Sequence, residues 1–150
     1  MNKDLASLLL RLAGIGLAIG HGWGKVVALF AGGGDRLVAG AGNLGFPMPE
    51  VFAWAAALSE FAGGLLVALG LGTRIAASFA GFTMAVAAFL RHRFHQHLLV
   101  ALGLAHASAD DLKSWGNPEL ALAYLLGFLA VILLGPGRIS LDYLLFRRRK

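Results

Sequence analysis

The stretch that most constrains this chain is Val51–Ile75, which is almost entirely apolar and carries a single carboxylate, Glu60, near its middle. An apolar helix of about 20 residues, rising 1.5 Å per residue, covers the ~30 Å hydrocarbon core of a bilayer. A charge at that depth costs at least about 2.5 kcal/mol on insertion scales. The small residues at helical spacing on the same face are Ala53, Ala56, Ala57, Gly63, Gly64 and Ala68. We therefore expect Glu60 to point into protein and not into lipid.

The composition agrees with a membrane protein. Hydrophobic residues make up 58% of the chain, charged residues 14%, and the mean hydropathy is +0.73. The net charge of +5 comes from basic residues scattered at span ends and in one terminal run, which argues against nucleic-acid binding. The chain has no cysteine, so it cannot itself hold an iron–sulfur cluster, attach haem covalently or exchange disulfides. Any redox chemistry must use a non-covalent cofactor or a partner protein.

Four apolar segments predict an all-α integral membrane four-helix bundle that forms one domain, 1–150. The predicted spans are about 5–30, 51–71, 74–94 and 119–137, followed by a basic C-terminal tail, 138–150. Glycines at every fourth position of the first span predict a packing stripe there, made of Gly16, Gly20 and Gly24. The apolar segment Leu98–Ala105 is too short to cross a bilayer, so we expect an interfacial or re-entrant piece in the outer loop.

The distribution of basic residues predicts the orientation. One side holds eight: Lys3, Arg11, Arg74, Arg138 and the run Arg147, Arg148, Arg149 and Lys150. The other side holds five: Lys25, Arg36, Arg91, Arg93 and Lys113. The richer side should be cytoplasmic, which places both termini in the cytoplasm.

Depth along the spans predicts a polar site in the outer half of the bundle. Counted inward at 1.5 Å per residue, His21 lies roughly 10 Å deep and Glu60 roughly 13 Å deep. We therefore predict that His21 and Glu60 are in contact and form the floor of an outward-facing pocket. Its predicted walls are Trp23, Trp54 and Tyr124, with Lys25 and His92 near its mouth.

Several motifs resemble those of a known family. They are LLLRLAGIGLAIGHGWGK, SEFAGGLLVALGLGTR, MAVAAFLRH and, most specifically, LLGPGRISLD. Together they resemble the DoxX family of small four-helix membrane proteins. The family's recurring motifs match His21-Gly22, Glu60-x-x-Gly63-Gly64 and Gly135–Asp142, whereas Arg91–His97 departs from its pattern.

The resemblance implies a bacterial or archaeal cytoplasmic-membrane protein. Relatives include the membrane subunit of a thiosulfate:quinone oxidoreductase, and many members have no assigned activity. Quinone is therefore the expected cofactor, and a redox protein the expected partner.

The roles of the central polar residues stay open between functional and structural readings. Glu60 can handle protons through a pKa raised by desolvation, or form half of an ion pair that joins helices. His21 can bind a quinone carbonyl, exchange protons with Glu60, or hydrogen-bond Glu60 as a packing device. Lys25 can be a ligand group or an anchor whose amine reaches the interface.

Two further groups of polar residues are present, one in the outer loop and one at the cytoplasmic end. His92, His95 and His97 resemble a metal cluster, but Arg91 and Arg93 add unfavourable positive charge, so metal is not expected. Haem held by two histidines is disfavoured, because His21 and His92 differ in depth by roughly 8 Å. At the cytoplasmic end, the residues Arg74, Arg138, Ser140 and Asp142 predict an Arg–Asp pair and a helix cap that close the base of the bundle.

The function favoured by the sequence is a quinone-interacting membrane subunit of an oxidoreductase system, with Glu60 and His21 as its catalytic candidates and substrate oxidation carried out by a partner. The alternative is a non-catalytic membrane anchor or scaffold for partner redox enzymes. A small-solute transporter is third. Homo-oligomerisation stays open.

Overall fold

The structure is a computed structural model that describes residues 3–146, and within this range it contains helices and no strands. The first long helix has 28 residues. It runs from α1 (Lys3–Leu17) through a π-helical turn, η1 (Ala18–Gly22), into α2 (Trp23–Phe30). At 1.5 Å per residue it is long enough to cross a membrane. The predicted all-α membrane fold is confirmed.

The second and third long helices form an antiparallel pair, and each contains a π-helical segment. The second comprises α4 (Pro49–Leu58), η2 (Ser59–Gly63) and α5 (Gly64–Leu69), and the third comprises α6 (Thr73–Ala85) and η3 (Val86–Arg91). They have 21 and 19 residues and are apolar enough to span a membrane. A π-helical turn takes in one additional residue, so it changes which side chains face a neighbouring helix.

The fourth span is assembled differently. The helix α9 (Glu119–Leu134) is bent by 42° from the short helix α8 (Ala109–Trp115), so residues 3–146 contain three membrane-spanning helices, or four if this pair is one broken span. Three other short helices are α3 (Asp35–Asn43), α7 (Phe94–Ala101) and α10 (Leu141–Phe146). Because α7 has only eight residues, it cannot cross a bilayer. The basic run Arg147–Lys150 lies outside the described residues.

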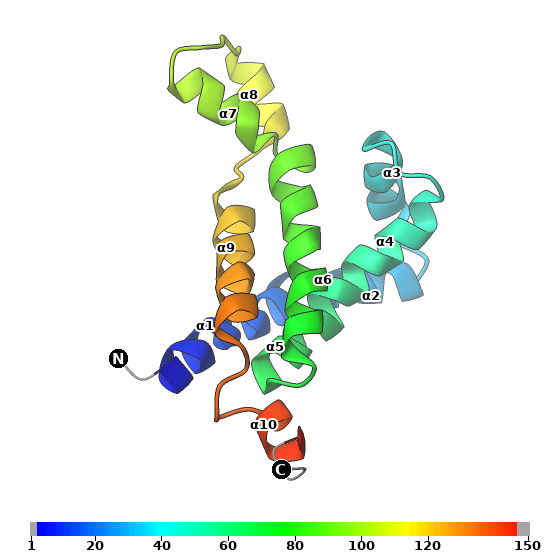
Figure 1. The fold of residues 1–150 in the computed structure, drawn as a ribbon. Helices are drawn as coiled ribbons and strands as arrows, with labels where there is room; N and C mark the ends of the chain where they lie inside the picture. Colours follow the sequence, from blue (N-terminus) through cyan, green and yellow to red (C-terminus); the bar gives the residue numbers. More distant parts are fainter. Residues whose placement is uncertain (1–2, 147–150) are drawn as a thin grey trace.

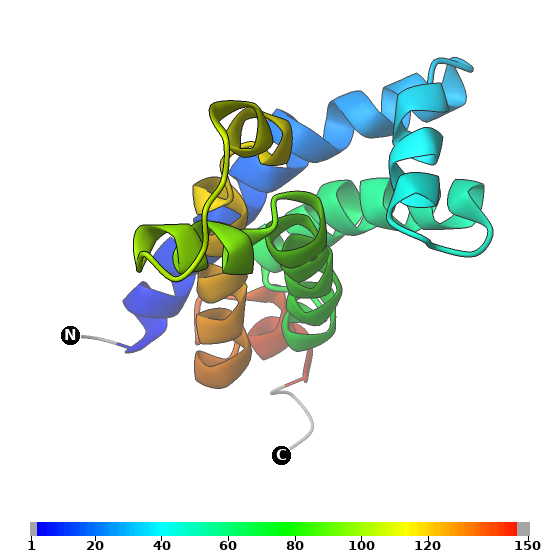
Figure 2. The same ribbon diagram turned by 90° about the horizontal axis from the view of Figure 1, so that it is seen from above.

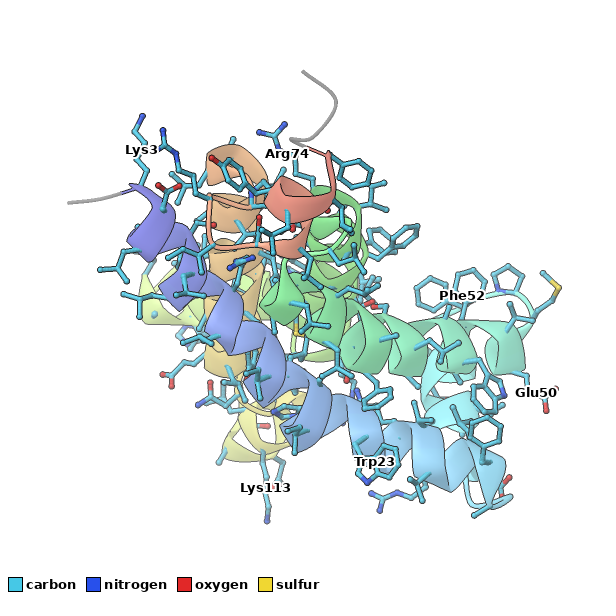
Figure 3. The ribbon with its side chains drawn as sticks, turned by 90° about the horizontal axis from the view of Figure 1, so that it is seen from below. Lys3, Trp23, Glu50, Phe52, Arg74 and Lys113 are labelled. Carbon is cyan, nitrogen blue, oxygen red and sulfur yellow. The ribbon has the colours of Figure 1, made fainter. Side chains whose placement is uncertain are left out.

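The long helices form two arms that cross instead of lying parallel (Figures 1 and 2). The first arm is the pair Lys3–Phe30 and Pro49–Leu69, and the second arm is the pair Thr73–Arg91 and Glu119–Leu134. The arms meet around a buried core, and the outer part of the first arm extends away from the second, where Trp23 and Phe52 lie along it (Figure 3). The core consists of Leu17, Val67, Ala76, Ala77, Ala80, Met84, Phe128 and Val131.

Glycines bring the two helices of the first arm into backbone contact. A Cβ added at Gly14 would lie 2.3 Å from the carbonyl oxygen of Gly64, and one added at Gly22 would lie 2.4 Å from the amide nitrogen of Phe61. Side chains larger than hydrogen are therefore excluded at these positions.

The predicted glycine stripe is on the wrong face. Added Cβ atoms at Gly20 and Gly24 would meet nothing within 4 Å, and one at Gly16 would meet only the side chain of Tyr124. The stripe that makes the contact is displaced by two residues and includes Gly14 and Gly22. Glycine spacing alone does not show which side of an apolar helix faces its neighbour.

The first and last segments of the described chain lie together at the base. We define the base as the end of the molecule that carries Lys3, the turn Gly70–Gly72 and α10. Asp142 accepts hydrogen bonds from the amides of Gly72 and Thr73, at 2.7 and 2.9 Å, and from the Thr73 hydroxyl at 2.7 Å. It thereby satisfies amides at the start of α6 that have no partner within the helix.

Other contacts at the base confirm one prediction and correct another. The Ser140 hydroxyl accepts from the Tyr143 amide at 3.2 Å, so the predicted N-cap of α10 is confirmed. The predicted Arg–Asp pair is wrong in its partners. Arg74 is exposed and has no ion pair within residues 3–146, and Arg138 lies near Asp4, 3.9 Å from Nε to Oδ2. The charged group beside Asp142 is Arg11.

Arg11 is 1% exposed, although sequence reasoning treated it only as an orientation signal. Its Nη2 group donates to the Ile139 carbonyl, while Nε and Nη1 have no partner within residues 3–146. One turn earlier, the Ser7 hydroxyl donates to the Gly135 carbonyl at 2.7 Å. The spacing of Ser7 and Arg11, one turn apart in an otherwise apolar helix, was the signal that could have predicted the burial of Arg11.

The first prediction concerns the glycine contact. Gly22→Ala should lower the free energy of unfolding by about 1–3 kcal/mol, because its new Cβ would overlap the Phe61 backbone. Gly20→Ala is the matched control and should be neutral or stabilising by up to about 1 kcal/mol, because nothing lies within 4 Å of the new Cβ. Thermal unfolding in detergent, followed by circular dichroism, measures both. Equal shifts of the unfolding temperature in both variants would contradict the contact between Gly22 and the Phe61 backbone.

The second prediction concerns acid stability. Burial alone would raise the pKa of the Asp142 carboxyl, but hydrogen bonds from Thr73 and Gly72 and the charge of Arg11 outweigh it and hold the pKa below its ordinary value. The stabilisation is therefore fully present above the unfolded-state pKa of about 3.9, and it is lost as pH falls through the lower folded-state pKa.

Asp142→Asn should cost about 1–2 kcal/mol of unfolding free energy at neutral pH. This deficit should shrink below about pH 4, where the wild-type carboxyl also becomes protonated. Unfolding midpoints measured from pH 7 downward test both points, with the exposed Asp110→Asn as the control. A deficit that does not change with pH would contradict the assignment.

Candidate functional site

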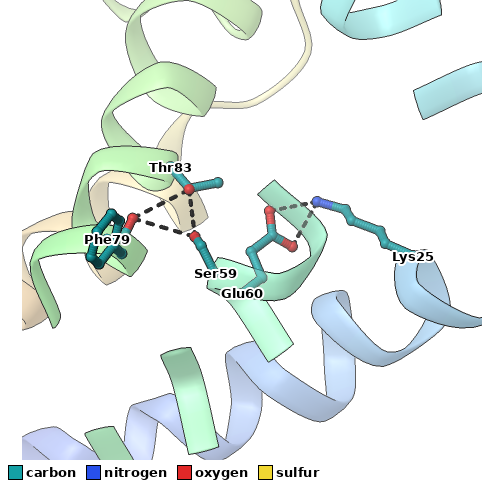
Figure 4. A network of polar contacts seen from close by, with 5 residues as sticks. All are labelled: Lys25, Ser59, Glu60, Phe79 and Thr83. Atoms are coloured by element: carbon teal, nitrogen blue, oxygen red, sulfur yellow. Dashed lines mark hydrogen bonds and ion pairs between the residues drawn. The ribbon is translucent and has the colours of Figure 1, made fainter. Parts of the chain in front are cut away.

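Glu60 is buried where the two helices of the first arm touch. It lies in η2, is 2% exposed, and packs near Gly22, whose lack of a side chain allows the backbones to approach. The prediction that Glu60 points into protein is confirmed. Beside it, the Ser59 hydroxyl lies 2.6 Å from the Thr83 hydroxyl and so joins the second helix to the third (Figure 4).

The partner of Glu60 is Lys25. Lys25 Nζ lies 2.6 Å from both carboxylate oxygens, and its side chain is 33% exposed (Figure 4). An ion pair of this kind offsets the desolvation of both charges, whereas removal of one partner leaves an uncompensated charge at a cost of about 3–5 kcal/mol. The predicted direct contact between His21 and Glu60 is therefore wrong. Lys25 follows His21 by one turn, and its longer side chain reaches the carboxylate.

His21 and Glu60 nevertheless line the same cavity, of about 180 Å³, where the two arms meet. Its polar lining residues are His21, Lys25, Glu60, His92, Asn117 and Tyr124. Its apolar lining residues are Leu17, Met84, Ala87, Leu120 and Ala121. All four long helices contribute. Five of the residues predicted from the sequence as site residues are thus brought together.

Three aromatic or imidazole side chains are held in defined positions around this cavity. The rings of His21 and Tyr124 meet edge to face, with 6.2 Å between their centroids. Gly16 leaves room for the Tyr124 hydroxyl, because an added Cβ would lie 2.8 Å from it. His92 Nδ1 lies 2.9 Å from the Trp115 carbonyl. A carbonyl only accepts, so Nδ1 carries the proton, and in neutral His92 the Nε2 atom is left as an acceptor.

The two tryptophans predicted to wall the pocket lie outside it. Trp23 is 53% exposed and packs on Phe61, with ring centroids 5.4 Å apart, while Trp54 packs on Phe30 at 4.8 Å. Both contacts join the helices of the first arm to each other. Depth along a helix placed both tryptophans in the outer part of the bundle, but it did not show toward which neighbouring helix each side chain points.

Of the other histidines of the outer loop, His97 helps to hold that loop together. His97 Nε2 donates to the Gly116 carbonyl at 3.0 Å, and its ring meets the Trp115 ring edge to face at 5.5 Å. His95 is exposed. Within residues 3–146, no group of three or more metal-ligating side chains has an arrangement that could hold a metal ion.

The cavity therefore combines apolar walls with a small number of converging polar groups, which is typical of small-molecule sites. Lys25 and the His21 imidazole can donate hydrogen bonds to a ligand oxygen, and His92 Nε2 can accept one. Glu60 and His21 can hold or release a proton beside it. The arrangement can hold a small ligand that carries polar groups.

Comparisons with known proteins identify relatives. Residues 6–93 match the DoxX family. The chain is 32% identical over 147 residues to inner membrane protein YqjF of Escherichia coli (strain K12), with 97% of this chain and 96% of that protein covered. It is 31% identical over 141 residues to inner membrane protein YphA of the same organism, with 93% and 90% covered. No solved structure matches the chain. The family match covers more than half of the chain, and both relatives align along nearly its whole length. The chain therefore belongs to the DoxX family, as the sequence motifs predicted.

Proposed function

We propose that this chain is a quinone-interacting membrane subunit of an oxidoreductase system and that the quinone head group binds in the cavity beside Lys25 and Glu60. The observation that carries the proposal is a partly buried ion pair that lines a partly apolar cavity together with His21, His92 and Tyr124. Buried charges within a membrane protein commonly mark a ligand or proton path.

The chemistry of the lining residues fits a quinone head group. Such a head group is a flat ring with carbonyl oxygens that accept hydrogen bonds, and the amine of Lys25, the hydroxyl of Tyr124 and an imidazole N–H are suitable donors. The volume, about 180 Å³, equals that of roughly six waters in the liquid, which is enough for a substituted ring but not for a long tail. The tail would then lie between the arms or in lipid.

Reduction of a bound quinone consumes protons as well as electrons. Glu60 and His21 are positioned to hold a proton beside the cavity, and Lys25 to stabilise negative charge there. The chain has no cysteine for thiol or cluster chemistry, so we assign substrate oxidation to a partner redox protein.

One observation favours the second candidate, a non-catalytic anchor or scaffold. The Lys25 amine contacts both oxygens of Glu60, a geometry in which each charge already satisfies the other. A pair that only joins helices would have this arrangement as well. The third candidate, a small-solute transporter, has no comparable support, because the cavity lining includes Leu17 and Met84, which lie toward the base on the first and third helices and are apolar.

The location follows from the relatives and from the chain ends. YqjF and YphA are both named inner membrane proteins, and we place this multi-pass chain in the inner membrane as well. Asp4 and Arg138 meet at the base, so the two ends of the described chain lie on one side of the membrane. We propose that this side is cytoplasmic, because the sequence assigns it eight basic residues against five when the terminal run 147–150, which lies outside the described residues, is counted with it.

The third prediction tests this orientation. Because the chain has no cysteine of its own, single introduced cysteines report their side of the membrane. Lys113→Cys in α8 should react with a membrane-impermeant thiol reagent applied from outside, whereas Arg138→Cys at the base should react only after permeabilisation. The reverse pattern would show the inverted orientation, and reaction of both from outside would show that α8 and the base lie on the same side of the membrane.

The fourth prediction concerns the ion pair. Lys25→Met should lower the free energy of unfolding more than Glu60→Gln, because it leaves the more deeply buried charge, Glu60, without compensation, at a cost of about 3–5 kcal/mol. The double variant should recover most of that loss, because no unpaired charge remains. Thermal unfolding of the three variants in detergent measures these differences.

The same variants test the function. A soluble quinone analogue should raise the unfolding temperature of the wild type and of the exposed-surface control Lys113→Gln, but not that of the folded double variant. Quinone should also be co-extracted with the wild type and with Lys113→Gln, but not with the folded double variant. If the folded double variant binds like the wild type, or if the wild type never responds, the pair is structural and the scaffold function is favoured.

A further inference from the structure

A second cavity lies at the end of the molecule opposite the base, and the quinone proposal does not use it. It has a volume of about 740 Å³ and is lined by residues of α3, the end of η3 and α8. Its charged lining residues are Arg36, Arg91, Arg93 and Asp111. We call this cavity the arginine basin. Three guanidinium groups against a single carboxylate make it a region of positive potential.

The hydrogen bonds within the protein leave most of these guanidinium donors unused. Arg36 has no hydrogen bond or ion pair within residues 3–146. Arg91 makes one long hydrogen bond, 3.4 Å, to the Ser114 carbonyl. The Arg93 guanidinium lies over the Trp115 ring, 6.0 Å from its centroid. An arginine side chain has five N–H donors, so the basin presents many that a ligand could use.

The single carboxylate does not neutralise the basin. The Asp111 carboxylate accepts from both the hydroxyl and the amide of Ser108, at 2.7 and 3.0 Å, and so closes a capping box at the start of α8. The Ser108 hydroxyl is the main reason that the pKa of Asp111 is below its ordinary value, and the charge of Arg93 lowers it further. Asp111 is thus mainly occupied by the helix cap.

The backbone turn that brings two of the arginines to the basin is strained. Arg93 has a φ of 48°, in the left-handed region that non-glycine residues rarely adopt. This turn ends the third span at Arg91 and starts α7 at Phe94. Glycine or asparagine would be the easier choice at this position. The strained turn thus places Arg91 and Arg93 on the same cavity as Arg36.

The basin also has an apolar side. Leu44, Leu90 and Trp115 line it together with the arginines. Leu90 lies near the end of a membrane-spanning helix, and tryptophan is enriched at the level of lipid head groups. A ligand that is anionic at one end and apolar at the other fits both sides of this cavity.

We propose that the arginine basin binds a phosphate group, that of an anionic phospholipid head group at the membrane surface. Arginine forks pair with phosphate oxygens in two parallel hydrogen bonds, which lysine cannot do. The same chemistry would recognise free phosphate in solution, and the experiment below distinguishes the two sources.

The experiment uses the full-length protein in detergent. Native mass spectrometry measures the fraction that retains phosphatidylglycerol or, as the zwitterionic comparison, phosphatidylcholine. The test variant is Arg36→Gln with Arg91→Gln. The matched control is Lys3→Gln with Arg74→Gln, which removes the same charge from exposed positions at the base. Inorganic phosphate is added as competitor, with chloride at equal ionic strength as its control.

We expect the wild type and the control variant to prefer phosphatidylglycerol, and the test variant to bind it at least about tenfold more weakly. Competition by phosphate beyond the effect of chloride would support the same site with a soluble ligand as its source. Equal loss in both variants, equal binding of the two lipids, or no binding of either ligand would overturn the proposal. If the double variant does not fold, the single variant Arg36→Gln decides, because Arg36 has no intramolecular partner to lose.

The outcome does not depend on the quinone proposal. The test variant leaves Lys25 and Glu60 unchanged, so its response to the quinone analogue should equal that of the wild type.

Discussion

The burial of one carboxylate governs the arrangement of the first arm. Glu60 can lie in the interior only because Lys25 compensates its charge, and Lys25 can reach it only because the two helices touch at Gly14 and Gly22. The close approach and the ion pair therefore depend on each other. The cavity lies beside this contact, so a change in the distance between the two helices would also change the position of its polar groups.

A buried charge is also compensated at the base of the molecule, by different groups. There the buried charge is Arg11, which donates to the Ile139 carbonyl and is attracted by the nearby carboxylate of Asp142. Asp142 in turn satisfies the first amides of α6. Two basic side chains of the first helix are thus compensated by different parts of the chain: the partly exposed Lys25 by the second helix, and the buried Arg11 by the segment after the last span.

Helix length, polarity and small-residue content predicted the fold class, the burial of Glu60 and the cap at Ser140, because these depend on local properties of the chain. Depth along each helix also placed His21 and Glu60 at one level, with Tyr124 in the same outer third and Lys25 and His92 above them. Direction around a helix could not be obtained in this way. Each of the first three spans contains a π-helical segment, which shifts the faces that a regular helix would present. The predicted glycine stripe, the tryptophan walls and the His21–Glu60 contact all required that direction, and all three were wrong.

The contacts at the base also determine when the molecule can be completed. The Ser7–Gly135 and Arg11–Ile139 contacts each join residues 128 positions apart in the sequence. During synthesis, the first helix enters the membrane long before its acceptors exist, so the charge of Arg11 is uncompensated until the last residues emerge. A chain that stops before Ile139 can form every long helix and still lack the groups that allow Arg11 to be buried. The C-terminal segment is therefore the last step of assembly, and a truncated product should be recognisable to quality control by its unsatisfied arginine.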